Sequence, residues 1–482
     1  QISPLDRSSA ASDVYKRQIL DISHQLIKRA RHKVIQIRRL FRKTNDFLLL
    51  LVGATIVSLV ALGFSKLIDY ATELNHYWLE HYYFLTAFVL IPPGFMLLTF
   101  LTMRLAPYTA GSGIPQVMAS LIEPNGAKKK LLLRLIPTLL KMPLTFLGLI
   151  FGASIGREGP TVQLGASIML AWGEFCNRFR LVKRRFKKND LLAMGAAGGI
   201  AAAFNAPLAG IIFAIEELSK LTTLKWERQI MFGILASGFI LIAIEGNNPH
   251  FPVFHGSAQN EENLLIWVFI CALVCGITGG MFSKLLIKGF GYISPARCKN
   301  FFSKHPVLLS GIMGLGVATI GIYFHGDTYG VGYELSKKAL LGNMQYVPGL
   351  TLGKFTASIF SYWAGLPGGI FTPSLSIGSL IGIGLHNLFS IAPLDTEVIV
   401  LLCMAAFLAA VTQSPLTASI IVVEMTLSIS ILFWLLICCI LTCFVAQQFS
   451  PRSFYLSSAI KYFGLLLALE PEYLSNKIKK RK

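Results

Sequence analysis

The sequence predicts an all-α polytopic membrane protein built from two related halves. Of its 482 residues, 54% are hydrophobic and only 14% are charged, whereas a soluble protein carries about a quarter charged residues. The mean hydropathy is +0.61. A hydrocarbon core of ~30 Å needs about 20 apolar residues in a helix that crosses it. Apolar runs of roughly this length recur near 47–68, 84–105, 131–155, 190–215, 229–245, 264–288, 307–324, 350–387, 399–423 and 430–447.

Two pairs of motifs recur at nearly one offset, which indicates an internal duplication. The stretch 152–165 (GASIGREGPTVQLG) matches 369–378 (GIFTPSLSIG), and 206–216 (APLAGIIFAIE) matches 414–424 (SPLTASIIVVE). The aligned positions are Gly156/Gly369, Pro160/Pro373 and Gly165/Gly378, offset by 213, and Pro207/Pro415, Leu208/Leu416 and Glu216/Glu424, offset by 208. We therefore expect a first membrane repeat over 45–245, an inter-repeat loop over 246–263 and a second repeat over 264–460.

The ends of the chain carry much of the net charge of +20, in the basic stretches 28–43 and 477–482. The positive-inside rule places both termini in the cytoplasm and makes the number of crossings even. In the tail 1–44, apolar residues fall at helical spacing between Ile27 and Phe41, which is typical of a helix on anionic headgroups and also of a simple charged leader. Residues 1–18 match neither this helix nor a signal peptide; disorder and an artefactual leader both explain them. The segment 461–482 is expected to be a short basic tail.

No soluble partner or cofactor is indicated by the remaining composition. No nucleic-acid-binding module accompanies the basic clusters, so a nucleic-acid partner is not expected. The eight cysteines are scattered without a CxxC pair, and the nine histidines form no ligand set, so neither a metal site nor another cofactor is expected.

Three segments combine glycine, proline and a helix-start pattern, namely 111–115 (GSGIP), 156–160 (GREGP) and 368–373 (GGIFTP), and a fourth, 451–455, contains proline and a helix-start pattern. Glycine lets a ligand approach the backbone, and proline in a first helical turn loses no hydrogen bond. The first three segments are predicted to break the chain inside the membrane and to start a helix there. Several helix N-termini aimed at one point bind an anion without a full cation. The alternative is that glycine and proline only allow close packing; three breaks in a duplicated chain favour the binding site.

Ionisable residues inside apolar runs indicate function by default, because they are costly in lipid. Glu158 next to an anion site can fill that site as a carboxylate and leave it when protonated, so that one side chain exchanges a proton for an anion. Structural alternatives stay open: Arg157 can pair with a carboxylate, one member of the Glu216/Glu217 pair can be structural because Glu216 repeats as Glu424, and Lys141 can be an ion-pair partner.

The GSGIP, GREGP and GGIFTP segments, NAPLAGIIFAIEE at 205–217 and the late Tyr455 together resemble the CLC family of chloride channels and proton-coupled chloride transporters. The resemblance covers about 45–460. It implies two inverted-topology repeats of broken and tilted helices, a homodimer with one pathway per subunit, and a multi-pass protein of the cell (inner or plasma) membrane. No paired regulatory domains follow the second repeat, which points to a prokaryotic-type member.

The resemblance also implies roles for individual residues. Chloride is expected to bind the Ser112 hydroxyl, the backbone N–H groups of Ile370 and Phe371, and the Tyr455 phenol, although PRSFYLSSAI around Tyr455 departs from the commoner PLYxA run. Glu158 resembles the gating glutamate that competes with chloride and transfers the external proton. Supporting positions are Gly111, Gly113, Pro115, Gly156, Arg157 and Lys141, a buried family lysine.

Glu217 resembles the internal proton-transfer glutamate, which favours exchange of two chlorides for one proton over a passive chloride channel on the same fold. Gln116 departs from the glutamate that many relatives carry after GSGIP. A fluoride-selective relative is disfavoured by Ser112 and the tyrosine. The protein is not expected to be an enzyme, because Gly111-Ser112-Gly113 has no histidine partner that would make an intramembrane serine hydrolase.

Overall fold

The computed structural model describes residues 4–123, 131–179, 181–182, 186–220, 228–246, 248–254, 261–389 and 396–468. Side chains are described from residue 45 onward, except 261–263 and 465–468, and for Lys28, Arg31 and His32. The expected basic tail 477–482 and part of the inter-repeat loop lie outside these residues. All-α architecture is confirmed for the described ranges, whose long elements are α1 (Pro4–Phe84), α2 (Ile91–Leu105), α3 (Ile114–Ile122), α5 (Leu135–Ile150), α6 (Glu158–Arg178), α7 (Lys188–Ala203), α8 (Pro207–Glu216), α9 (Arg228–Glu245), α10 (Glu261–Lys288), α11 (Ala296–Lys304), α12 (Pro306–Tyr323), α13 (Tyr333–Leu340), α14 (Leu350–Trp363), α15 (Phe371–Leu388), α16 (Thr396–Thr412), α17 (Pro415–Thr426), α18 (Leu432–Phe449) and α19 (Phe454–Ala468).

Five described segments are helical, long and apolar enough to cross a membrane: Asn45–Leu105, Arg228–Glu245, Leu264–Lys288, Pro306–Tyr323 and Ile429–Phe449. The first contains two of the expected apolar runs and departs from helical geometry at Tyr82. Three other runs are each divided into two shorter helices, namely α7 and α8, α14 and α15, and α16 and α17. The chain is therefore an integral membrane protein in which many helices end inside the apolar body.

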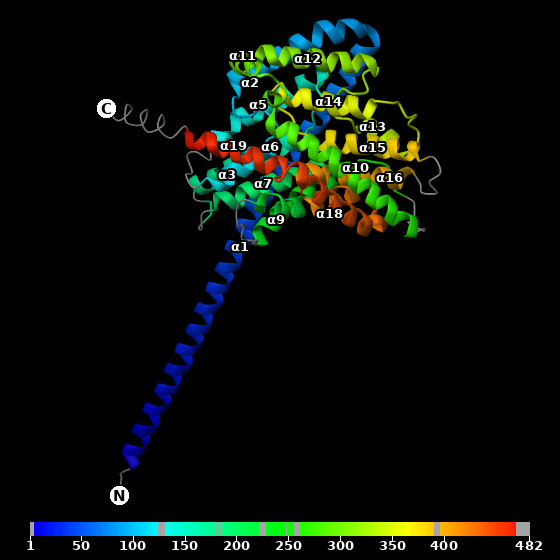
Figure 1. Cartoon of the computed structure of the whole chain (residues 1–482). Coiled ribbons are helices and arrows are strands. Elements are labelled where there is room, and N and C mark those ends of the chain that lie inside the picture. Colours follow the sequence, from blue (N-terminus) through cyan, green and yellow to red (C-terminus); the bar gives the residue numbers. More distant parts are fainter. Residues whose placement is uncertain are drawn as a thin grey trace, which may run out of the picture.

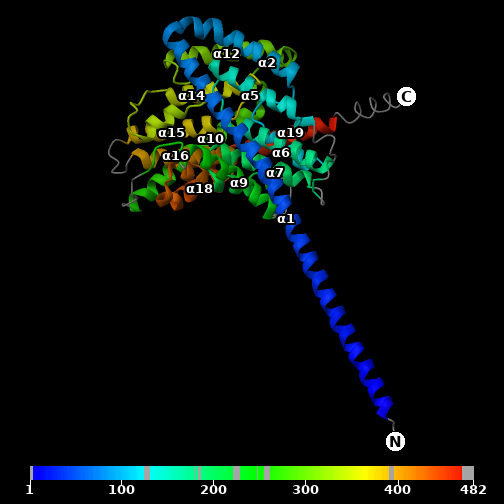
Figure 2. The same cartoon turned by 180° about the vertical axis from the view of Figure 1, so that it is seen from behind.

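The helices form one packed body from which the first part of α1 projects (Figure 1, Figure 2). The expected basic helix over 27–41 lies within this projecting part. From about residue 45 onward, α1 packs along the body beside α9, α6 and α7.

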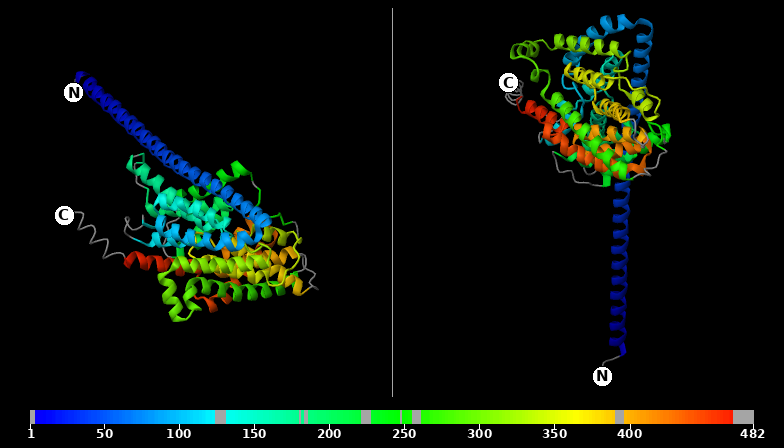
Figure 3. Two further views of the ribbon diagram at one scale, coloured as in Figure 1. Left: turned by 90° about the horizontal axis from the view of Figure 1, so that it is seen from above. Right: turned by 45° about the vertical axis from the view of Figure 1, so that its right-hand side comes forward.

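Glycines bring helices together at related places in the two repeats. In the first repeat, α6 and α7 meet at Gly165 and Gly195, where a Cβ on either residue would clash with the other's backbone. In the second repeat, α15 and α16 meet at Gly378, where a Cβ would lie 2.5 Å from the carbonyl oxygen of Cys403. Figure 3 shows these central helices from above and from the side. The close approach explains why glycine occupies both positions.

A reciprocal contact relates the repeats by a two-fold axis. The Glu424 carboxylate accepts the backbone N–H groups of Leu208 (3.1 Å) and Ala209 (2.6 Å) at the start of α8. The Glu216 carboxylate accepts those of Leu416 (3.1 Å) and Thr417 (2.6 Å) at the start of α17. Two surfaces that exchange equivalent contacts are related by a two-fold. The expected duplication is thus present in three dimensions.

Candidate functional site

Three chain breaks meet inside the body, each directly before a helix start. The helices α3, α6 and α15 begin at Ile114, Glu158 and Phe371, as the motifs predicted. The backbones of the second and third breaks join at Gly156 and Gly369, which exchange two N–H···O bonds of 2.7 Å each. The first and third join through the Gly111 N–H, which donates to the Leu366 carbonyl at 3.1 Å, and the Gly368 N–H, which donates to the Gly111 carbonyl at 3.2 Å.

Glycine is required where these breaks touch. Gly113 has φ 108°, which is unfavourable for other residues, and a Cβ on it would lie 2.7 Å from the Gly159 carbonyl oxygen. A Cβ on Gly159 would clash with the Ser112 hydroxyl, and one on Gly369 would lie 2.9 Å from the Gly159 nitrogen. The start of α6 is therefore in contact with both Ser112 and the segment before α15.

The N-terminal N–H groups of α15 have no acceptor within their own helix. The first helical bond runs from the Ser374 N–H to the Ile370 carbonyl at 3.0 Å, which leaves the N–H groups of Ile370 and Phe371 free of intrahelical bonds. Both residues are buried. The N-terminal end of a helix carries about half a positive charge and attracts anions.

Two buried hydroxyl groups complete this donor set. Ser112 is 1% exposed and Tyr455 is fully buried, and among the described residues neither hydroxyl oxygen has a hydrogen-bond partner. The two side chains are neighbours, and the Tyr455 ring stacks on Phe371 with a centroid distance of 5.8 Å. Buried hydroxyls rarely remain unpaired. Together with free N–H groups at a helix N-terminus, they form a donor set suited to an anion.

Glu158 is the first residue of α6 and is fully buried. Its Oε1 accepts a hydrogen bond of 3.1 Å from the Tyr333 hydroxyl. Its Oε2 has no partner in the described part of the chain. This oxygen is so close to Gly156 that a Cβ on that residue would lie 2.5 Å from it. The carboxylate therefore lies at the junction of the second and third breaks.

Arg157 precedes Glu158 but pairs elsewhere. Its Nη1 donates to Asp69 at 3.0 Å, and the guanidinium lies 5.0 Å from the centroid of the Tyr333 ring. Arg157 thus has the carboxylate partner that its structural alternative describes, and its supporting role at the ion site stays a prediction.

Glu217 follows α8 and is 1% exposed. Its Oε2 accepts hydrogen bonds from Lys220 Nζ at 2.8 Å and from the Ser414 hydroxyl. Lys220 also donates to the carbonyls of Thr412 (2.9 Å) and Gln413 (3.1 Å) at the end of α16. The Lys220 side chain is 19% exposed, so it links the buried carboxylate to solvent. The neighbouring Glu216 caps the start of α17, as described above.

Lys141 and Gln116 have neutral partners. Lys141 is fully buried and donates to the Gln163 side-chain oxygen at 2.9 Å, so the ion-pair alternative for Lys141 is not what the structure contains. The Gln116 amide donates to the Ala110 carbonyl at 2.8 Å and to the Tyr462 hydroxyl at 3.1 Å. Gln116 thereby connects the first break to α19.

Sequence reasoning missed three polar neighbours of the two glutamates: Tyr333, Lys220 and Ser414. Lys220 lies three residues after Glu217, a spacing at which side chains meet in a helical turn, and this signal was available. A second buried lysine was also missed, Lys354, which lies 213 residues after Lys141 and so fits the repeat offset. Nothing in the sequence around Tyr333 indicates its partner.

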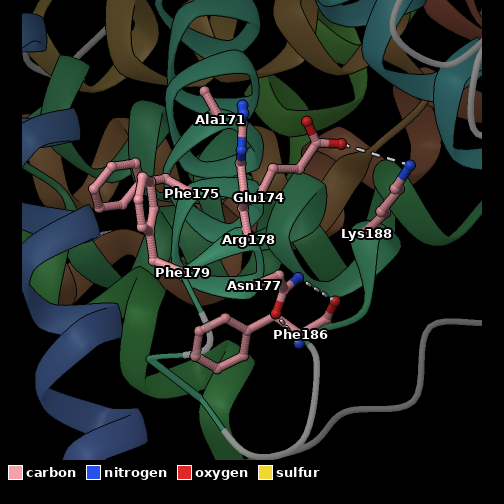
Figure 4. A pocket seen from close by; sticks show the side chains of 8 residues that line it. All are labelled: Ala171, Glu174, Phe175, Asn177, Arg178, Phe179, Phe186 and Lys188. Atoms are coloured by element: carbon pink, nitrogen blue, oxygen red, sulfur yellow. Dashed lines mark hydrogen bonds and ion pairs between the residues drawn. The ribbon is translucent and has the colours of Figure 1, made fainter.

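A cavity of about 620 Å³ at the end of α6 lies apart from these residues (Figure 4). Four of its lining residues are paired with one another. Lys188 lies 3.5 Å from Glu174, and the Asn177 amide bonds the Phe186 backbone in both directions. None of the residues predicted for the ion site lines it.

Comparisons with known proteins agree with this geometry. The voltage gated chloride channel family profile matches residues 94–447. The chain is 29% identical over 461 residues to the H(+)/Cl(-) exchange transporter ClcA of Klebsiella pneumoniae (strain 342), covering 90% of this chain and 92% of that protein. It is 30% identical over 447 residues to the ClcA of Citrobacter koseri, covering 87% and 90%.

A similar fold is found in the crystal structure of a slow cyanobacterial Cl⁻/H⁺ antiporter. Its TM-score is 0.72 at 24% identity, and the match covers 87% of this chain and 98% of that one. The family match spans most of the chain. The ClcA of Citrobacter koseri is similar to this chain over nearly its whole length. The chain therefore belongs to the CLC family, the voltage gated chloride channel family.

Proposed function

We propose that the protein exchanges chloride for protons across a membrane, with two chlorides moved for each proton. The observation that supports this most is a pair of buried carboxylates, Glu158 and Glu217, which both lie within electrostatic reach of the Tyr455 phenol. The relatives named H(+)/Cl(-) exchange transporter support the same activity.

Chloride binds, in this proposal, to the hydroxyls of Ser112 and Tyr455 and to the N–H groups of Ile370 and Phe371. These donors are dipoles rather than full charges. An ion held by dipoles at the end of a helix is stabilised enough to enter the protein but is still able to leave. Passage of chloride does not require a lysine or arginine at the ion.

Protons move through the two carboxylates. Glu217 takes a proton from the side where Lys220 is exposed. Glu158 receives it and is neutral while it carries it. When ionised, Glu158 competes with chloride for the free N–H groups; when protonated, it does not. Proton and chloride movements are thereby linked in opposite directions.

The setting follows from the charge distribution and the family. The basic stretches 28–43 and 477–482 support termini on the cytoplasmic side, and membership of the family supports the inner or plasma membrane of the cell. The functional unit is a homodimer with one complete pathway per subunit, in contact with the lipid bilayer.

A passive chloride channel on the same fold is the second candidate. It would need the anion donors and Glu158 but not Glu217. The placement of Glu217, buried and bonded to a partly exposed lysine, favours the exchanger, because a channel has no use for a proton route to the interior.

The test is proton uptake by liposomes that contain the purified protein, loaded with high chloride and diluted into low chloride at equal pH. Potassium and valinomycin hold the voltage at the proton equilibrium potential, so passive leaks carry no net protons. A rise of external pH driven by chloride efflux is the expected result. Chloride efflux without proton uptake under this clamp would establish a channel.

A further inference from the structure

Tyr333, the first residue of α13, is the side chain that hydrogen-bonds Glu158. Its hydroxyl donates to Oε1 at 3.1 Å, while Oε2 is unpaired among the described residues. No backbone N–H in the described ranges donates to Glu158. The carboxylate is thus attached to Tyr333 and not to the N–H groups of Ile370 and Phe371, which a chloride ion would use.

The Tyr333 ring is fixed from several sides. The Arg157 guanidinium lies 5.0 Å from its centroid, the His250 ring stacks at 6.1 Å and the Phe251 ring lies at 5.6 Å. Arg157 is in turn paired with Asp69. These contacts hold the ring, and the Arg157 and Thr372 side chains also lie beside the hydroxyl that bonds Glu158.

The backbone before Tyr333 is also fixed. Gly332 has φ 91° and is the N-cap of α13. The fully buried Lys354 donates to the carbonyls of Thr328 (3.0 Å), Tyr329 (3.2 Å) and Gly330 (2.9 Å). Three bonds to consecutive carbonyls hold this segment in one conformation and so set the position of the Tyr333 hydroxyl.

Tyr333 also lines a cavity of about 410 Å³. Glu158 is fully buried and is not part of the cavity lining. Tyr333 therefore lies between the carboxylate and the cavity. The ionisable groups that line the cavity beside it are mainly acidic: Asp69, Glu73, Asp327 and Glu334, with His76 and Lys338.

We propose that Tyr333 is a positioning residue that holds the Glu158 carboxylate away from the chloride-binding N–H groups and next to this acidic cavity. The proposal rests on the proposed function, in which Glu158 competes with chloride. The phenol is a neutral donor, and the Arg157 cation, which also lies within electrostatic reach of Glu158, is paired with Asp69. Loss of the hydroxyl frees the ionised carboxylate to turn to the N–H groups of Ile370 and Phe371, where it excludes chloride.

The other charged groups near Tyr333 do not account for such a competition. Arg157 is paired with Asp69, and Lys354 is bonded to three carbonyls. Burial, and then the charge of Arg157, lowers the pKa of His250 to about 4, so its ring is neutral near pH 7. Glu158 is left as the anion that competes.

Chloride titration calorimetry of the detergent-purified protein tests this with four proteins: the wild type, Tyr333→Phe, Glu158→Gln and the double variant. Phenylalanine keeps the ring and all of its packing contacts. At pH 7.5 we expect Tyr333→Phe to weaken chloride binding by about tenfold, the size of a lost hydrogen bond to a charged group. In the Glu158→Gln background the same change is expected to have no effect, because glutamine is not an anion.

Two controls separate positioning from packing. Tyr329→Phe removes a phenol that donates to the Ala318 carbonyl at 3.1 Å in the same segment and is expected to leave chloride affinity unchanged. The Glu158→Gln background is the second control, because it removes the anion while the Tyr333 ring keeps its packing contacts.

Equal affinities of wild type and Tyr333→Phe at pH 7.5 would overturn the proposal, as would an equal loss in the Glu158→Gln background. Absence of chloride binding in all four proteins would instead sink the proposed function. The two failures are therefore distinguishable.

Discussion

The two repeats place the same backbone features at related positions but carry different side chains where the corresponding helices begin. Gly156 and Gly369 are counterparts and bond each other through both N–H groups. Glu216 and Glu424 are counterparts and cap each other's helices with the same two distances. These symmetric residues hold the repeats together.

The residues assigned to transport are asymmetric. Glu158 begins α6, whereas its counterpart at an offset of 213, Phe371, begins α15 and stacks on Tyr455. Glu217 has Met425 as its counterpart at an offset of 208. One repeat thus supplies the carboxylates and the other supplies apolar walls and N–H donors. In the proposed function, duplication provides the scaffold and divergence at a few helix ends provides the chemistry.

Among these variants, Glu158→Ala should have the largest effect on transport. The variant makes the start of α6 as uncharged as the start of α15 and leaves the donors for chloride in place. We expect chloride flux to persist and proton flux to fall to that of empty liposomes, measured with a chloride electrode and a pH electrode in one chamber. Chloride-driven proton uptake that survived would remove Glu158 from the exchange.

Glu217→Gln tests the second asymmetric carboxylate and should likewise stop proton flux while chloride flux continues, because the amide cannot carry a proton inward. Met425→Leu is the matched control on the other repeat, a change that conserves volume at a fully buried site. It is expected to leave both fluxes unchanged. Retained coupling in Glu217→Gln would make Glu217 a structural residue like Glu216.

Glu216→Ala and Glu424→Ala test the symmetric residues, with smaller effects on stability and none on coupling. Each variant leaves two backbone N–H groups at a helix start without their carboxylate, which we expect to destabilise the fold by about 1–3 kcal/mol. Because the capping distances are the same in both directions, the two thermal midpoints measured in detergent should fall by similar amounts. Clearly unequal losses would show that the two caps are not equivalent.

The helix starts at Ile114, Glu158 and Phe371 could be predicted from the sequence, because local signals mark them, whereas the roles of the residues beside them stay predictions. Glycine and proline break the chain at Ser112, Glu158 and Phe371 whatever the rest of the fold does. The repeat offset suggested that one member of the Glu216/Glu217 pair is structural, and Glu216 is the one that caps the start of α17.

The polar partners of the carboxylates could not be predicted in the same way. Tyr333 is 175 residues from Glu158, and Ser414 is 197 residues from Glu217. No periodicity or motif joins such positions; the packing of α13 against α15 and the end of α16 near α8 bring them together. Lys220 is the exception, because it lies within one turn of Glu217.

Lys220 provides the mildest test of the asymmetry, because its counterpart at an offset of 208, Ser428, carries no charge. Lys220→Met removes the cation that bonds Glu217 at 2.8 Å and so removes the link between this carboxylate and solvent. The Lys220 side chain is 19% exposed, so solvent screens part of this charge. We expect chloride-driven proton uptake to slow by about twofold while chloride flux is unchanged. Lys220→Arg keeps the charge and should keep the wild-type rate. No slowing in Lys220→Met, or an equal slowing in both variants, would mean that Lys220 only supports the end of α16 through its bonds to the Thr412 and Gln413 carbonyls.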